Sequence, residues 1–144
     1  MSYHQPTVEE ELERKVTERL HLTLQYLSKN AVTKDYAKGT LDALWDASSG
    51  LVSKDLMELM SGAIEAVNEL KTPQRMRVFT KEKRVMILTI PEQSEPSCEL
   101  IEIYPNFQPK YRNLTSEDDT LDEAMAKLSK TAEALLQRDF MEIK

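Results

Sequence analysis

Glu18 and His21 are the residues of this chain whose types and spacing could support metal chemistry. They form a Glu-x-x-His pair, a spacing that places a carboxylate and an imidazole on one face of a helix, as in di-iron bundles. A di-iron centre also needs a second such pair and further glutamates on facing helices. The other histidine, His4, precedes the helix and cannot supply that pair. We therefore interpret Glu18 and His21 as a helix-surface pair or a boundary histidine, and predict no metal centre.

Nucleophilic catalysis has one candidate, the single cysteine Cys98. A lone cysteine at the start of a strand is most often a small buried hydrophobic residue, although the sequence alone leaves open a dyad with His21. The three glycines are dispersed, whereas phosphate-binding loops need clustered glycines. Four nearby acids are interpreted as a solvated face: Glu92, Glu95, Glu99 and Glu102. The sequence thus predicts a protein that is not an enzyme and needs no cofactor.

Charge is segregated along the chain. Residues 71–86, here called the basic ribbon, carry six cations against the single acid Glu82, a net charge of +5, within a chain of net charge −6. The flanking segments 1–70 and 87–144 carry −5 and −6. The cations are Lys71, Arg75, Arg77, Lys81, Lys83 and Arg84. Because this segment contrasts with everything around it, we expect it to face a partner.

Three interpretations of the basic ribbon remain open. Strand alternation places four residues on one face, with Lys83 and Arg84 at or just past the turn: Arg75, Arg77, Phe79 and Lys81. Such a face could bind an acidic protein, or it could follow phosphates while Phe79 stacks on a base. Alternatively, the charges protect an edge strand from pairing with other sheets, and Glu99 and Glu102 neutralise them across the sheet.

A second candidate surface is the loop after the third predicted strand. It combines aromatic rings with cations, the residue types enriched in interface hot spots. Pro105 and Pro109 should hold the loop semi-rigid and lower the entropy lost on binding. The alternative is that the rings fold back over the core. The candidate residues are Tyr104, Phe107, Lys110, Tyr111 and Arg112.

The elements that position these residues follow from periodicity and capping signals. Apolar residues at helical spacing predict a helix over residues 8–29, a second one after Thr33, a third after Ser53 and a last one after Ser116. Alternation and β-branched runs predict strands at 75–81, 84–91 and 98–104. We expect a single α+β domain over residues 1–144, with a disordered N-terminus at 1–6. Its order is ααα-βββ-α, with an antiparallel meander and all helices packed on one face of the sheet.

The first helix carries an apolar stripe opposite an acidic face. Such a helix usually packs within its own domain, and the alternative is a helix–helix contact in a homodimer. The acidic helices at both ends of the chain could also contact the basic ribbon in the free protein and compete with a partner for it.

Together these features predict a small, acidic, non-enzymatic protein-interaction module of accessory, inhibitor or adaptor type. It would bind an acidic or mixed protein surface through the basic ribbon and the aromatic loop. The alternative is a nucleic-acid-associated protein that uses the same ribbon. No apolar run is long enough for a membrane helix and no signal peptide is evident, so we expect a cytoplasmic protein without membrane contact.

Overall fold

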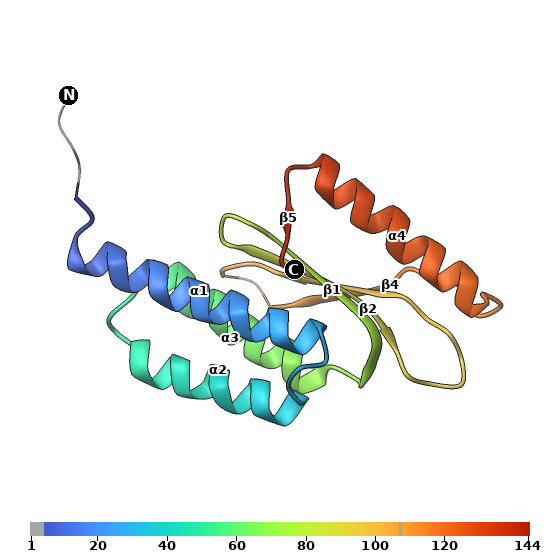
Figure 1. The fold of residues 1–144 in the computed structure, drawn as a ribbon, viewed down its shortest axis with the longest axis horizontal. Coiled ribbons are helices and arrows are strands. Elements are labelled where there is room, and N and C mark those ends of the chain that lie inside the picture. The colour runs from blue at the N-terminus through green and yellow to red at the C-terminus, as the bar shows by residue number, and fades with distance from the viewer. Residues whose placement is uncertain (1–4, 107) are drawn as a thin grey trace.

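The computed structural model describes residues 5–106 and 108–144. Most of the expected disordered N-terminus, and the expected role of Phe107 in partner binding, fall outside this range. The described chain forms four helices and five strands in an α+β fold (Figure 1). Their order is α1 (Val8–Ser28), α2 (Lys34–Ser48), α3 (Lys54–Glu69), β1 (Pro73–Lys81), β2 (Arg84–Pro91), β3 (Glu99–Ile103), β4 (Lys110–Asn113), α4 (Leu121–Gln137) and β5 (Met141–Glu142).

The first three helices begin where their capping residues predict. Thr7, Thr33 and Ser53 each accept a hydrogen bond from the backbone N–H three residues further on, at 3.1–3.2 Å. This bond satisfies one of the donors that a helix leaves unpaired in its first turn. Helix α1 ends at the predicted place, where Asn30 has a positive φ of 59°.

The sheet is antiparallel, with the strand order β4-β3-β2-β1-β5. The predicted meander of three strands is present as β1, β2 and β3. The predicted number of strands is nevertheless wrong, because β4 and β5 extend the sheet at its two edges. Strand β4 lies in the segment expected to be a loop, and β5 in the segment expected to end the last helix.

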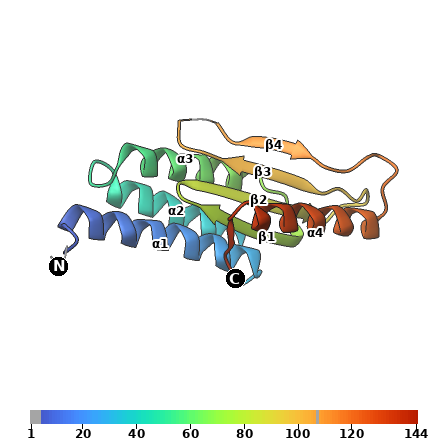
Figure 2. The ribbon, with the colours of Figure 1, turned by 90° about the horizontal axis from the view of Figure 1, so that it is seen from above.

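The sheet is covered on both faces, contrary to the expectation that all helices share one face. Figures 1 and 2 show α1, α2 and α3 on one side of the sheet and α4 on the other. Strand β2 explains this, because Val85–Pro91 are all buried and each face therefore needs an apolar cover. The face toward α1–α3 includes Val78, Ile87 and Ile101, and the face toward α4 includes Phe79, Leu88 and Leu100.

Helix α4 starts later than predicted. Ser116 does not cap it; instead, its N–H donates to the carboxylate of Asp119 at 3.0 Å in a turn that precedes the helix. Thr120 is the N-cap and forms a capping box with Glu123. Phe140, expected near the end of this helix, lies beyond it and packs into the core beneath α4.

Candidate functional site

The basic ribbon spans the two residues before β1, β1 itself, the turn and the first three residues of β2. Its residues alternate between faces as predicted. Met76 and Val78 belong to the core beneath α1–α3, so the odd-numbered residues from Arg75 to Lys81 face α4. Phe79 is one of these, and it is completely buried among side chains of β2 and α4. The only aromatic ring of β1 is thus a core residue and is not available to stack on a base or a partner.

Arg77 is held by an acid from the end of the chain. Its Nε and Nη2 donate to the two carboxylate oxygens of Glu142 at 2.8 and 2.7 Å, which ties β1 to β5. The Glu142 side chain is 12% exposed. The bonds from Arg77 hold the pKa of Glu142 below its usual range, although burial opposes this. Arg77 therefore has a structural partner within the chain.

Lys83 and Lys81 are also engaged. The Nζ of Lys83 lies 3.1 Å from the Glu13 carboxylate, which also accepts hydrogen bonds from the backbone N–H and hydroxyl of Ser53. Burial disfavours ionisation of Glu13, but the bonds from Ser53 and Lys83 outweigh it and lower its pKa. Lys81 donates to the carbonyl of Arg138 at the C-terminal end of α4, at 2.9 Å.

Acids from both ends of the chain thus contact the basic ribbon, through Glu13 on α1 and Glu142 on β5. Any partner of Arg77 or Lys83 would have to displace them. The remaining strand cations are Arg75 and Arg84. Arg84 lies at the turn between β1 and β2, and Arg75 lies near the other end of this hairpin. Arg75 is exposed and donates only to the neighbouring carbonyl of Gln74 among its described bonds. The basic ribbon is therefore not one continuous binding surface.

A different cationic surface forms on the α4 face, around Glu102 of β3. Arg112 of β4 lies 3.6 Å from one Glu102 oxygen, and the Tyr104 hydroxyl donates to the other at 3.3 Å. Lys110 is directly opposite Glu102 in the β3–β4 register. The Arg84 guanidinium lies 6.0 Å from the centre of the Tyr104 ring, within range of a cation–π contact.

Arg138, at the end of α4, completes this surface. Lys81 donates to the Arg138 carbonyl and is directly opposite Arg84 in the β1–β2 register, so the end of α4 lies beside this part of the sheet. Burial raises the pKa of Tyr104 and the charge of Glu102 adds to the rise, whereas the charges of Arg84 and Arg138 oppose it. We call this set the Glu102 patch. It holds four cations and one carboxylate, a net charge of +3: Arg84, Glu102, Tyr104, Lys110, Arg112 and Arg138.

The expected aromatic loop is divided between the two faces of the sheet. Lys110 and Arg112 belong to the Glu102 patch, but Tyr111, between them on β4, points to the α3 side. Tyr111 as a whole is 49% exposed. Burial of its other half raises the pKa of Tyr111, and the charges of Glu65 and Glu69 on α3 add to the rise.

Sequence reasoning missed two features of the Glu102 patch. It placed Glu102 opposite the basic ribbon, and Glu102 does lie opposite Met86 of that ribbon, but it did not predict β4, whose Arg112 lies beside the acid. It did not include Arg138, although a cation at the end of a helix is visible in the sequence. Its position near Tyr104 depends on α4 crossing the sheet, which no local signal shows.

The catalytic alternative left open by the sequence does not fit the geometry. Cys98 is buried beneath α4, whereas His21 lies on α1 at the opposite side of the sheet. Burial raises the pKa of the Cys98 thiol to about 11, with a further contribution from Glu99. Burial also lowers the pKa of His21. Among the residues described, no group of three or more acids, histidines and cysteines is arranged to hold a metal ion.

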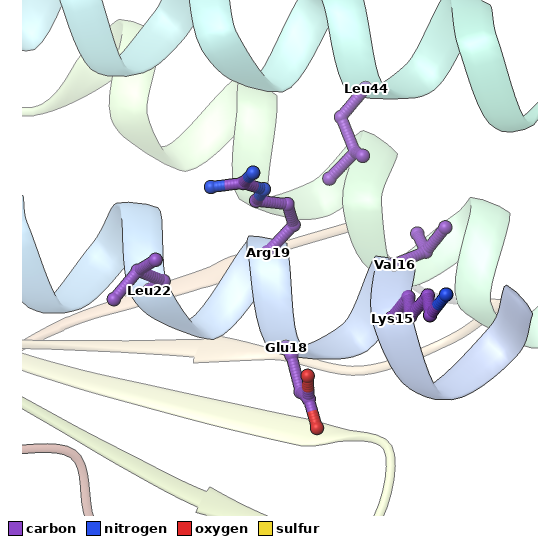
Figure 3. A pocket seen from close by; sticks show the side chains of 6 residues that line it. All are labelled: Lys15, Val16, Glu18, Arg19, Leu22 and Leu44. Carbon is purple, nitrogen blue, oxygen red and sulfur yellow. The ribbon is translucent and has the colours of Figure 1, made fainter. Parts of the chain in front are cut away.

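A shallow hollow of about 380 Å³ lies on the outer side of the helical layer, between α1 and α2. Figure 3 shows Arg19 of α1 and Leu44 of α2 reaching into the space between the two helices, while the Glu18 carboxylate points away. The apolar stripe of α1, including Leu20 and Leu24, is buried within the domain. A homodimer through α1 would have to use the exposed flank, and it stays a prediction.

Comparisons with protein-family models, curated proteins and solved structures found no match for this chain. Within the ranges that the structure describes, no helix has the length and apolar character needed to cross a membrane. The candidate site therefore rests on its own geometry and charge.

Proposed function

We propose that this protein is a non-catalytic protein-interaction module whose Glu102 patch binds an acidic segment of a partner protein. The observation that carries the proposal is the net charge of +3 gathered on one sheet face, in a chain whose net charge is −6. Cations that stabilise only their own fold would each have an acid nearby. The Glu102 patch instead has four cations and a single carboxylate.

The chemistry of the patch supports an acidic protein partner. Arginine and tyrosine are enriched in the residues that contribute most to protein–protein binding, and arginine can hold a carboxylate through two parallel hydrogen bonds. Arg112 and Arg138 are exposed, and Arg84 is half-exposed. A positive patch on an acidic protein also orients an approaching acidic partner, because the rest of the surface repels it.

The same cations could attract nucleic acid, which is the alternative that the sequence raised. Stacking on a base needs a free aromatic face, but the Tyr104 ring is contacted by Arg84 and Phe79 is buried. We therefore favour a protein partner and treat nucleic acid as an outcome of the test.

The test is affinity capture from a native lysate with and without nuclease, read by mass spectrometry. The variant Arg84→Glu/Arg112→Glu reverses two charges of the Glu102 patch. The control Lys54→Glu/Lys71→Glu makes the same change in net charge at exposed positions outside the patch. Circular dichroism verifies that both variants fold.

The proposal predicts a defined acidic protein that the wild type and the control retain and the patch variant loses. Retention should weaken as salt rises, because exposed charges are screened over a Debye length of about 8 Å at 0.15 M salt. Equal retention by the patch variant would refute the proposal. Recovery of many proteins that disappear with nuclease would favour nucleic acid instead.

A further inference from the structure

Strand β4 is an open edge of the sheet. It lies at the end of the strand order (Figure 2), and all four of its residues are exposed. The Leu114 N–H donates to the Cys98 carbonyl at 2.8 Å. This bond shows which residues of β4 direct their backbone groups toward β3 and which direct them away. Residues 110 and 112 therefore direct their backbone groups toward β3, and Tyr111 and Asn113 direct theirs outward. Two N–H and two C=O groups are thus aligned to pair with another extended chain.

The two sides of this edge carry opposite charges. Lys110 and Arg112 project on the α4 face, where they belong to the Glu102 patch. Tyr111 projects on the other face, where Glu65 and Glu69 of α3 are the charges that act on it. Glu65 also lines a hollow between α3 and the start of β4, together with Pro109. An added strand would therefore meet cations on one face and carboxylates on the other.

We propose that β4 binds an extended partner segment by strand addition, and that this segment alternates acidic, basic and acidic residues. Side chains directly opposite each other on neighbouring strands interact, and opposite charges are favourable there. The two acidic residues would face Lys110 and Arg112. The basic residue between them would lie beside the Tyr111 ring and near the carboxylates of Glu65 and Glu69. Because this pattern reads the same in both directions, it fits parallel and antiparallel addition alike. The inference rests on the proposed function and specifies its partner.

A second copy of this chain is a poor occupant of the edge. Antiparallel pairing of two β4 strands about a two-fold axis perpendicular to the sheet joins like faces. The Lys110 and Arg112 cations of one copy would then lie beside those of the other, which is destabilising. The charges thus prevent self-pairing, the usual role of charged edge strands, yet they match a segment of the opposite pattern.

Binding is tested with fluorescently labelled synthetic peptides and the full chain. One peptide has glutamate, lysine and glutamate at its centre, flanked by threonine and valine, and the other has lysine, glutamate and lysine. We expect the first to bind about tenfold more tightly, and Lys110→Glu/Arg112→Glu to remove this preference. No detectable binding, or equal affinity for both peptides, would overturn the inference.

Strand addition is separated from simple charge attraction by the backbone. Tyr111→Pro removes an outward N–H that takes no part in the β3–β4 ladder, and Tyr111→Thr removes the same ring but keeps that donor. We expect the proline variant to bind the first peptide about tenfold more weakly than the threonine variant, because the backbone donor is lost. Equal affinities would show that the backbone is not used.

A measurement on the unaltered protein covers the case in which Tyr111→Pro does not fold. Two versions of the first peptide are N-methylated at alternate backbone amides. Binding should be lost when the methylated amides are those that face β4, and kept when the methyl groups are shifted by one residue and face away. If both frames bind alike while Arg84→Glu/Arg112→Glu still loses its captured partner, strand addition is wrong and the proposed function stands. If that variant keeps its partner and no peptide binds, both proposals fail.

Discussion

Replacing Glu142 with glutamine should loosen the attachment of β5 to β1. The substitution preserves the shape of the side chain but removes the negative charge of the carboxylate, whose two oxygens accept hydrogen bonds from Arg77 at 2.7 and 2.8 Å. Strand β5 has only two residues, and the Ile143 N–H donates to the Val78 carbonyl just beyond the pair. The ion pair should therefore contribute much of what holds this edge strand.

The expected magnitude lies between those of a buried and an exposed ion pair. Hydrogen bonds to charged groups contribute about 1.5–3 kcal/mol, and exposed pairs contribute less than about 1 kcal/mol. The Arg77 side chain is 33% exposed and that of Glu142 is 12% exposed, so solvent screens the pair in part. We expect the free energy of unfolding to fall by about 1–2 kcal/mol, equivalent to a drop in Tm of about 3–8 °C.

The effect should depend on pH. Arg77 lowers the pKa of Glu142 relative to the ordinary value of 4.5, so the folded state favours the ionised carboxylate. This contribution to stability is fully present above the unfolded pKa, and is lost as the pH falls through the lower folded pKa. The difference in Tm between wild type and Glu142→Gln should therefore be largest near neutral pH and shrink below about pH 4.5.

Thermal unfolding measured between neutral pH and pH 3 provides the assay. Glu18→Gln is the matched control, because its bond to Arg14 is even shorter, at 2.5 Å, but the side chains of Glu18 and Arg14 are 63% and 53% exposed. The control should leave Tm nearly unchanged. Hydrogen exchange at Ile143 should accelerate only in Glu142→Gln. A fall in Tm that is independent of pH, or equal in the control, would refute the role assigned to the ion pair.

Four further predictions concern the core and the helices. Phe79→Ala should lower the free energy of unfolding by about 3–5 kcal/mol in chemical denaturation, and a cost below 1 kcal/mol would mean that the ring is not buried. Gly39→Ala should stabilise the protein by about 0.5–1 kcal/mol because its Cβ would meet no atom within 4 Å. Gly62→Ala should destabilise it, because its Cβ would lie 2.8 Å from Cγ2 of the buried Ile103, and equal effects at the two glycines in thermal melts would contradict this packing. Cys98 should resist thiol reagents at pH 8 until denaturant is added, since burial raises its pKa to about 11, and rapid labelling of the native protein would show that it is accessible.

The sequence predicts those parts of the fold that local signals determine. The capping residues Thr7, Thr33 and Ser53 and the apolar periodicity behind them locate α1, α2 and α3. The meander follows from alternation in β1 and from the apolar run of β2. That run also carried a signal that was not used: a strand buried over Val85–Pro91 needs a cover on both faces, which indicates α4 on the far side.

The remaining elements depend on tertiary contacts. Strand β4 has the sequence Lys-Tyr-Arg-Asn, exposed throughout, and forms because β3 offers an edge rather than because of its own pattern. Ser116 and Thr120 both precede acids at the capping-box position, and only the structure shows that Thr120 starts α4. The pairing of Arg77 with Glu142 joins residues 65 positions apart, which no local spacing reveals.

The candidate site could be predicted only in part for the same reason. Residue type correctly marks Arg84, Lys110 and Arg112 as cations near the sheet, but grouping them requires the β3–β4 register. Arg138 joins them because α4 crosses the sheet. Alternation in β1 predicts that Phe79 shares a face with Arg77. It does not reveal that α4 covers that face.

The most direct test of the Glu102 patch is an NMR titration of the labelled protein with the peptide that carries glutamate, lysine and glutamate at its centre. The amide signals of β4, together with those of Arg84, Tyr104 and Arg138, should shift most. Signals of Arg19 and Leu44, at the hollow between α1 and α2, should stay unchanged. Shifts confined to that hollow, or no shifts at saturating peptide, would contradict the account.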